Sequence, residues 1–364
     1  MIDGWKKVQV QEICTKGSSN IAQNKIEDNN GDYPLFGASG FLKCIDFYHQ
    51  ENPYIGIVKD GSGVGRVGFY PAKSSLLGTL QYILPKPGFD IRFIGYALKS
   101  LNLASYATGA AIPHIYFKEY GKDFVCIPPS FEEQIRVVAE LDLLNSIIEK
   151  KNAELRELDA LAQSLYHEMF SLCDDENNNW EIKCIKDVCT LKSGNSNANN
   201  SHAGDLPYVK VGDMSMKGNE KYITTSSQFV DRQENTKGIF PIGTTIFPKR
   251  GGAILTNKKR LTAVEICCDL NTMGVIPNRE YLHPTYLYQY FLCLDLGALC
   301  NGAAIPQLNN CDIGPLEIKI PPMELQMLFS QKVDKIEEQK KLIYKTLEET
   351  ETLYNSRMAF YFNK

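Results

Sequence analysis

The sequence predicts an α/β (α+β) fold, with two similar globular domains joined by two long antiparallel coiled-coil helices and related by a pseudo-twofold axis. Two observations predict this arrangement. The chain contains the same pattern twice, and each copy ends in about 40 residues without Gly or Pro. Four segments follow from them: globular domains over 1–130 and 172–322, and helices over 131–171 and 323–364.

The internal repeat is established by a five-residue identity. The segment Gly109–Pro113 (Gly-Ala-Ala-Ile-Pro) recurs at Gly302–Pro306, an offset of 193, and Ile127-Pro-Pro recurs at Ile320 with the same offset. Further towards the N-terminus, Trp5 corresponds to Trp180 at an offset of 175. The offset changes only between these blocks, as expected for homologous units that differ in loop length. The chain is therefore predicted to be a tandem duplication.

The first part of each copy has short β-branched and aromatic runs separated by turn residues, which indicates strands of an irregular α/β domain. These runs are Tyr54–Val58, Gly65–Tyr70, Gln81–Leu84, Thr244–Phe247 and Gly274–Ile276. Short helices are expected over Ile91–Leu101 and Pro284–Leu296.

The second part of each copy has an apolar residue every three or four positions, a heptad pattern typical of coiled coils. At 1.5 Å per residue, 40 helical residues span about 60 Å. A lysine, Lys151 or Lys340, interrupts the apolar pattern in each helix. The alternative is an amphipathic helix lying on its own domain. The residues expected to pair the two helices are Leu141, Leu144, Ile148, Leu155 and Leu158 in the first, and Ile336, Ile343, Leu347 and Tyr354 in the second.

Composition excludes several classes of protein. The net charge is −4, which argues against non-specific polyanion binding, but residues 1–130 carry +2 and residues 131–170 carry −5. No apolar run approaches the length of a membrane span and no signal peptide is evident, so a cytoplasmic location is expected. The eleven cysteines include no CxxC pair, which favours reduced thiols over a metal site.

Motifs that suggest catalysis lack their required context. Gly63–Gly68 matches the dinucleotide fingerprint, but Phe69-Tyr70-Pro71 follows where a helix should begin. Pro34–Gly40 is superficially like a methyltransferase cofactor loop, but the (Asn/Asp)-Pro-Pro-(Tyr/Phe) partner motif is missing. The five histidines, at positions 49, 114, 167, 202 and 283, occur singly. No catalytic residue and no metal ligand is therefore predicted.

Basic residues recur after equivalent strands of the two copies. Lys59, Ser62 and Arg66 follow the first strand, and five cations follow the second within twelve residues, namely Lys249, Arg250, Lys258, Lys259 and Arg260. Such loops suit contact with DNA phosphates or a groove edge, although a solvated charged turn is the alternative for either one alone. Lys210 is added as a further candidate. The two loops differ in sequence, as expected of domains that read different bases.

Two Gly- and Tyr-rich domains, each ending in Gly-Ala-Ala-Ile-Pro, then Ile-Pro-Pro and a long helix, resemble the specificity subunit of type I restriction–modification systems. That family has a Pro-Pro step followed by Glu-Gln, which Pro128-Pro129 with Glu133-Gln134 matches. In the second copy Leu325 replaces the acid, although Gln326 remains. Tyr33–Gly37 also looks like the family's first target-recognition domain.

The resemblance implies a non-catalytic DNA-recognition subunit. Each globular domain is expected to read half of a bipartite, asymmetric site, and the paired helices are expected to set the gap between halves. The partners implied are double-stranded DNA, two methyltransferase subunits and restriction subunits. S-adenosylmethionine, ATP and Mg²⁺ are expected in those partners and not in this chain. The residues expected at the subunit interface are Phe131, Glu132, Glu133, Gln134, Glu324 and Gln326.

Two other classes of function remain open from the sequence. One is a solitary restriction–methylation enzyme or nuclease, which cofactor-dependent activity of the isolated chain would reveal. The other is a coiled-coil scaffold without DNA recognition, in which loss of the cations at 249–260 leaves DNA binding unchanged.

Overall fold

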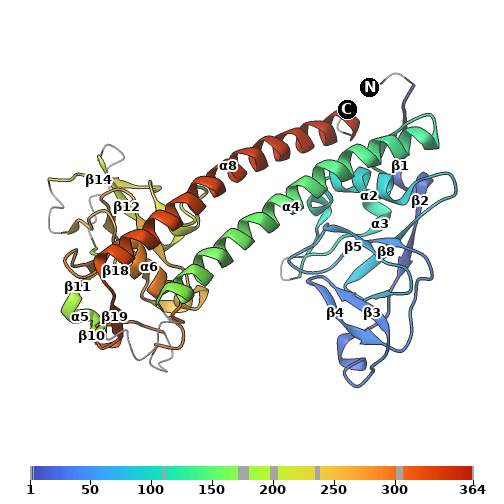
Figure 1. Cartoon of the computed structure of the whole chain (residues 1–364). Coiled ribbons are helices and arrows are strands. Elements are labelled where there is room, and N and C mark those ends of the chain that lie inside the picture. The colour runs from blue at the N-terminus through green and yellow to red at the C-terminus, as the bar shows by residue number, and fades with distance from the viewer. Residues whose placement is uncertain are drawn as a thin grey trace. The chain divides into compact units, whose positions relative to one another are not determined.

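The computed structural model describes residues 2, 4–109, 112–170, 180–196, 204–233, 238–300 and 306–362 (Figure 1). The chain divides into two compact units: the first consists of Met1–Ala153 with Ile343–Lys364, and the second of Glu154–Leu342. The two long helices are α4 (Phe131–Phe170) and α8 (Met323–Phe362). Both units contain part of each helix, so these units differ from the four segments predicted at 1–130, 131–171, 172–322 and 323–364.

The globular part of the first unit contains three small sheets. The strands are β1 (Lys6–Gln9), β2 (Cys14–Ser18), β3 (Tyr33–Gly37), β4 (Gly40–Ile45), β5 (Tyr54–Val58), β6 (Val67–Tyr70), β7 (Ser75–Leu76), β8 (Leu80–Pro85) and β9 (Phe124–Ile127). An antiparallel sheet has the order β2-β8-β5-β6, a second has the order β4-β3-β7, and β1 pairs with β9.

The short helices of this unit are α1 (Val10–Ile13), α2 (Ile91–Ser100) and α3 (Phe117–Tyr120), with 3-10 turns at Gln23–Lys25 and Leu103–Tyr106. The carboxylate of Asp90 caps α2 by accepting a hydrogen bond from the Phe93 amide at 2.8 Å. Gly95 lets α2 lie on Phe69 of β6, because a Cβ at this position would stand 2.1 Å from the ring.

The second unit repeats this plan. Its strands are β10 (Glu181–Cys184), β11 (Cys189–Ser193), β12 (Leu206–Val209), β13 (Tyr222–Ile223), β14 (Phe229–Val230), β15 (Thr245–Pro248), β16 (Arg260–Thr262), β17 (Cys267–Cys268), β18 (Thr272–Pro277) and β19 (Glu317–Ile320). They form sheets of order β11-β18-β15-β16-β13, β14-β12-β17 and β10-β19. Helices α5 (Ile185–Val188), α6 (Pro284–Leu292) and α7 (Asn310–Ile313) accompany them, with 3-10 turns at Val211–Ser215 and Gly251–Thr256.

Strand registers confirm the duplication at the offsets read from the sequence. Lys6 pairs with Ile127 where β1 meets β9, and Glu181 pairs with Ile320 where β10 meets β19, which are shifts of 175 and 193. The predicted strand Tyr54–Val58 is β5, and the other predicted strands lie within one or two residues of β6, β8, β15 and β18. The predicted short helices are α2 and α6, although α6 ends at Leu292 instead of Leu296.

The core of the first unit is completed by both long helices. Val137, Val138 and Leu141 from the start of α4 are buried in one cluster with Tyr361 and Phe362 from the end of α8. Figure 1 shows that end of α8, marked C, beside the start of α4. The Trp5 indole stacks on the Tyr361 ring, with centroids 5.8 Å apart and an interplanar angle of 11°. Such a pair contributes about 0.5–1.5 kcal/mol beyond the burial of its area.

The second unit is completed by the opposite ends of the same helices. Tyr166 and Phe170 from the end of α4 are buried with Phe329 and Val333 from the start of α8. The Phe170 and Phe329 rings meet edge to face, with centroids 5.3 Å apart. Because the start of each helix packs with the end of the other, the helices are antiparallel within both units.

The predicted pairing residues all avoid solvent. Leu141, Leu144, Leu155, Ile336 and Leu347 are buried, and Ile148, Leu158, Ile343 and Tyr354 are half-buried. Lys340, predicted to interrupt the apolar pattern, donates a hydrogen bond from its ammonium group to Asp159 of α4 at 2.8 Å. The end of α8 packs in the core of the first unit and the end of α4 in that of the second, so the alternative of two helices lying only on their own domains is wrong. Pairing through the individual heptad positions stays a prediction. No helix in the described part of the chain is long and apolar enough to cross a membrane.

Replacing Tyr361 with alanine is expected to lower the free energy of unfolding of the first unit by about 3 kcal/mol, because a buried aromatic ring is lost. Chemical denaturation measures the loss, and amide hydrogen exchange in β1 and β9 assigns it to this unit. Leu353→Ala is the control: this side chain of the same helix is 49% exposed, so the change should stay within about 0.5 kcal/mol. Equal effects of the two substitutions would contradict the proposed closure of the core.

Candidate nucleic-acid interface

Each globular domain brings a loop with basic residues against the loop that carries the repeated motif. The cation loops are defined as residues 59–66 after β5 and residues 249–260 after β15. The motif loops are defined as residues 108–115 and 302–308. Ala110, Ala111 and 302–305 lie outside the described residues, and the contacts below involve the remaining positions.

The cation loop and the motif loop are joined by the same backbone hydrogen bonds in both domains. The Gly61 amide donates to the Pro113 carbonyl at 2.8 Å, as the Gly251 amide does to the Pro306 carbonyl at 2.8 Å. The Ile115 amide donates to the Lys59 carbonyl at 3.0 Å, and the Leu308 amide donates to the Lys249 carbonyl at 2.9 Å. The structure thus brings the predicted basic loops against the last proline of the repeated motif twice, through the same backbone hydrogen bonds.

In the first domain the predicted basic positions lie on the surface. Ser62 and Arg66 are exposed, and Lys59 is half-buried beside Asp60, with the ammonium nitrogen 3.5 Å from the carboxylate. Asp60 also lies 3.8 Å from the Nδ1 atom of His114 in the motif loop. The Arg66 side chain is thus open to solvent, and its contact with DNA phosphate stays a prediction.

In the second domain the predicted cations divide into surface and interior groups. Arg250 is exposed, Lys210 is half-buried, and the half-buried Lys258 donates to the Ser215 hydroxyl at 2.5 Å. Lys249 is only 7% exposed and donates to the Ser193 hydroxyl at 2.8 Å. Burial, together with the charge of Arg250, lowers the pKa of Lys249. The prediction that Lys249 contacts DNA therefore needs correction, since its ammonium group is enclosed.

Lys259 is also buried, so the prediction that it contacts DNA needs the same correction. Its side chain is 1% exposed and donates to the Asn257 amide oxygen at 2.7 Å and to the Leu294 carbonyl at 2.6 Å. Burial lowers the pKa of Lys259 to about 8. The half-buried Arg260 donates to the Met214 carbonyl at 2.9 Å, and burial lowers its pKa. These two cations hold neighbouring segments of the domain together.

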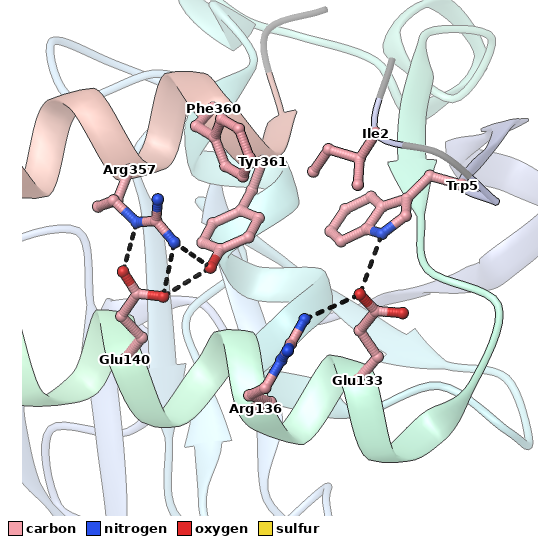
Figure 2. Close-up of a pocket in the computed structure, with 8 residues that line it drawn as sticks. All are labelled: Ile2, Trp5, Glu133, Arg136, Glu140, Arg357, Phe360 and Tyr361. Carbon is pink, nitrogen blue, oxygen red and sulfur yellow. Dashed lines mark hydrogen bonds and ion pairs between the residues drawn. The ribbon is translucent and has the colours of Figure 1, made fainter.

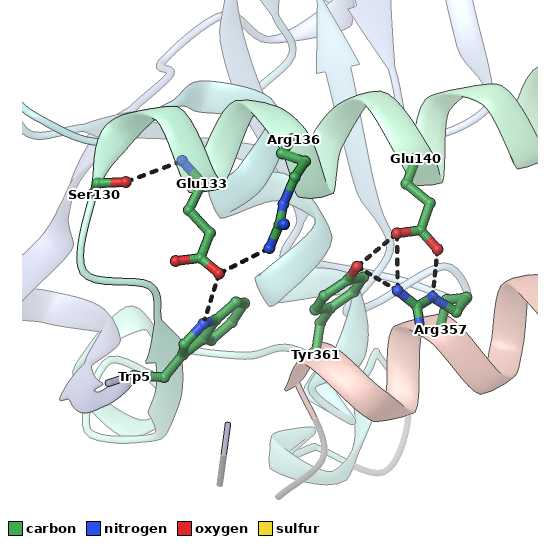
Figure 3. A network of polar contacts seen from close by, with 7 residues as sticks. All are labelled: Trp5, Ser130, Glu133, Arg136, Glu140, Arg357 and Tyr361. Carbon is green, nitrogen blue, oxygen red and sulfur yellow. Dashed lines mark hydrogen bonds and ion pairs between the residues drawn. The ribbon is translucent and has the colours of Figure 1, made fainter. Parts of the chain in front are cut away.

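The predicted subunit-interface residues lie at the starts of α4 and α8. Phe131, Glu132 and Glu324 are exposed. Glu133 is half-buried: it accepts a hydrogen bond from the Trp5 indole at 3.3 Å and one from Arg136 at 3.0 Å (Figure 3). In the second copy Leu325 stands at this position and packs in the same apolar cluster as Trp180. The two tryptophans thus meet different residues at equivalent places.

Gln134 and Gln326 are buried inside the chain, which corrects their predicted role at an interface. The side-chain oxygen of Gln134 accepts from the Asp90 amide at 2.9 Å, and that of Gln326 accepts from the His283 amide at 2.8 Å. Asp90 and His283 are the N-caps of α2 and α6. Each glutamine therefore fastens the start of a long helix to the short helix of its own domain.

A pocket of about 310 Å³ lies in the first unit where the N-terminal segment, the start of α4 and the end of α8 meet (Figure 2). Its lining residues are Ile2, Trp5, Glu133, Arg136, Glu140, Arg357, Phe360 and Tyr361. Glu140 accepts from Arg357 through both oxygens and from the Tyr361 hydroxyl, and these contacts lower its pKa (Figure 3). The carboxylate is thereby committed to joining α4 and α8.

Sequence reasoning missed this polar network. Glu140 lies 217 residues before Arg357, and no local pattern pairs the two side chains. Among the described residues, no group of three or more His, Cys, Asp or Glu side chains is arranged to hold a metal ion.

The comparison with protein families covers most of the chain. A model described as the type I restriction modification DNA specificity domain matches residues 2–158 and again residues 177–352. The chain belongs to this family. It is a specificity component of the type I systems and not an enzyme. The two matches cover both copies of the repeat.

Solved structures resemble the chain in fold. One is the S subunit of a type I restriction-modification system from M. genitalium, with a TM-score of 0.62 and 15% identity, covering 98% of this chain and 96% of that one. Another comes from a study of complex assembly and conformational transition in the type I R-M system, with a TM-score of 0.53 and 15% identity, covering 98% and 97%. Both support the two-domain α/β fold.

Arg250→Ala is expected to weaken DNA binding by the assembled complex and to lower the slope of log affinity against log salt by about 1, because one phosphate contact is lost. Fluorescence anisotropy at several salt concentrations measures both quantities. Arg279→Ala is the matched control, since this exposed arginine of the same domain donates to the Ile242 carbonyl. An unchanged slope for Arg250→Ala would exclude it from phosphate contact.

Lys259→Ala is expected to act on stability. It should lower the free energy of unfolding by about 1–3 kcal/mol, because the two hydrogen bonds of the buried ammonium group, to the Asn257 side-chain oxygen and the Leu294 carbonyl, are lost. The DNA affinity of the folded complex should stay at the wild-type value. Urea denaturation measures the stability and the anisotropy assay measures the DNA affinity. A variant with wild-type stability but reduced DNA affinity would show that Lys259 contacts DNA.

Gln134→Ala and Gln326→Ala are each expected to destabilise the chain by about 1–3 kcal/mol, because the backbone amides of the half-buried Asp90 and His283 lose their acceptors. Faster hydrogen exchange at those two amides is the local signature. The exposed neighbour Glu132 provides the control, and Glu132→Ala should change stability by no more than about 0.5 kcal/mol. If both variants kept wild-type stability but failed to assemble with the partner subunits, both glutamines would belong to the subunit interface.

Proposed function

We propose that this chain recognises a bipartite, asymmetric DNA sequence, with one half-site read by each globular domain, as the specificity subunit of a type I restriction–modification complex. One observation carries the proposal. The same pair of loops is built twice with identical backbone hydrogen bonds, whereas the exposed side chains of the two cation loops differ. Two domains that read different bases need the same backbone arrangement with different exposed side chains.

The long helices are proposed to set the distance between the half-sites. Each has 40 residues, or about 60 Å, which exceeds the roughly 34 Å that separates equivalent points one DNA turn apart. Gln134 and Gln326 support this role, since each ties the start of a long helix to the short helix behind it. A domain fixed to its helix transmits a change of helix length to the position of its loops.

The outer faces of the same helices are proposed to dock two methyltransferase subunits. Ile135 and Met327 stand at equivalent positions, offset by 192, and are 43% and 44% exposed. Phe131 and Glu132 lie beside the first, and Glu324 lies beside the second. Two equivalent surfaces on one repeated chain suit two copies of one partner. Exposed apolar side chains of this kind are typical of the centre of a protein interface.

Chemistry is proposed to reside in the partner subunits. Methyl transfer there needs S-adenosylmethionine, and cleavage by restriction subunits needs ATP and Mg²⁺. This chain supplies the choice of DNA sequence, and the cytoplasm is the proposed place of action because its DNA substrate is found there.

Lengthening both helices tests the function as a ruler. Seven residues inserted after Ala153 in α4 and seven after Leu342 in α8 preserve the heptad pattern and add about 10 Å. At about 3.4 Å per base pair, the gap between the half-sites should grow by about 3 base pairs while both half-site sequences stay unchanged. Genome-wide mapping of methylated sites in cells that carry the complex measures both.

The control places the same seven residues in the exposed turn at Ala72–Lys73, where neither gap nor half-sites should change. Altered half-site sequences with the original gap would refute the ruler. Absence of any bipartite methylated sequence for the wild-type complex would refute the proposed function itself.

A further inference from the structure

The first residue that differs between the domains after the shared Gly-Ala-Ala-Ile-Pro motif is His114 in one and Gln307 in the other. Both stand opposite a cation loop. A single antiparallel bridge pairs His114 with Asp60, and another pairs Gln307 with Arg250. The five residues before this position are identical in the two domains. At this position the two loops therefore carry different side chains on a shared backbone.

The backbone around this position is the same in both domains. Hydrogen bonds join the preceding prolines, Pro113 and Pro306, and the following residues, Ile115 and Leu308, to the cation loops in the same way. Ile115 and Leu308 are buried, at 2% and 0% exposure. Side chains alternate in direction along an extended segment, so residues 114 and 307 point away from the core. Gln307 is exposed, and His114 retains 34% exposure of its side chain.

Each of these side chains is oriented by the residue two positions later. The Nε2 atom of His114 lies 2.9 Å from the Tyr116 hydroxyl, and the Gln307 amide donates to the Asn309 side-chain oxygen at 2.8 Å. The Gln307 bond uses one amide hydrogen. The second hydrogen and the amide oxygen form the donor and acceptor pair that matches N7 and N6 of adenine in the major groove.

We propose that positions 114 and 307 are base-reading positions of the two domains, and that Gln307 reads an adenine in the half-site of the second domain. This inference rests on the proposed function and names the side chains that perform it. Residues shared by both domains cannot distinguish the half-sites, because they are the same in each. The side chain that differs within a shared frame carries that difference, while Arg250 across the bridge contacts phosphate.

The test compares Gln307→Ala, Gln307→Asn and His114→Ala in the assembled complex with its methyltransferase subunits. Competition binding with DNA altered at each base pair, together with mapping of methylated sites, reads out specificity. Gln307→Ala is expected to lose about 10- to 100-fold discrimination at one A·T pair of the second half-site, with the first half-site unchanged. Gln307→Asn should restore the preference for adenine, since asparagine carries the same amide.

His114→Ala is the matched control, because it should alter only the first half-site. Equal weakening on every DNA sequence, or an unchanged preference after Gln307→Ala, would overturn the assignment of position 307. Thermal melting of each complex establishes that the variants are folded. If the wild-type complex showed no preference for a bipartite sequence, the proposed function would be overturned. If Gln307→Ala kept the wild-type preference, only the assignment of Gln307 would be overturned.

Discussion

The structure depends on the way each globular core is closed. The aromatic end of α8 fills the first core against Trp5, and the aromatic end of α4 fills the second against Phe329. Both cores therefore need a helix that starts in the other repeat. Between these ends, the buried Lys340 of α8 donates a hydrogen bond to Asp159 of α4. Removal of large buried rings costs several kcal/mol, comparable with the stability of a whole domain, so neither helix end is dispensable.

The loops of each domain are fixed by hydrogen bonds of the backbone. Each motif loop is tied to its cation loop by backbone hydrogen bonds, and Gln134 or Gln326 ties the start of the long helix to the short helix of the domain. Hydrogen bonds to the backbone hold position without depending on loop side chains, which are then available to vary. The backbone bonds of the frame are preserved between the two copies, whereas the residues at positions such as 114 and 307 differ.

The sequence predicts the parts of this fold that depend on repetition and periodicity. The duplication, the two helices and their apolar pairing positions follow from offsets and heptads, which are visible in a single chain. The partners of buried polar residues cannot be predicted in this way. Gln134 and Gln326 look like surface residues at a helix start, and Lys259 looks like one of five loop cations, yet all three are buried with backbone partners. Burial of a polar side chain depends on groups brought together by the fold, and local sequence does not encode their identity.

Because distant helix ends complete the two cores, the first core can form fully only late in synthesis of the chain. Tyr361 joins Glu140 across 221 residues of chain, so the first domain leaves the ribosome long before the residues that complete it. Its Trp5 surface must stay uncovered through translation of the entire second repeat. Transient exposure of apolar surface favours aggregation and chaperone binding. A polypeptide that stops before Tyr361 lacks the aromatic segment that covers this surface.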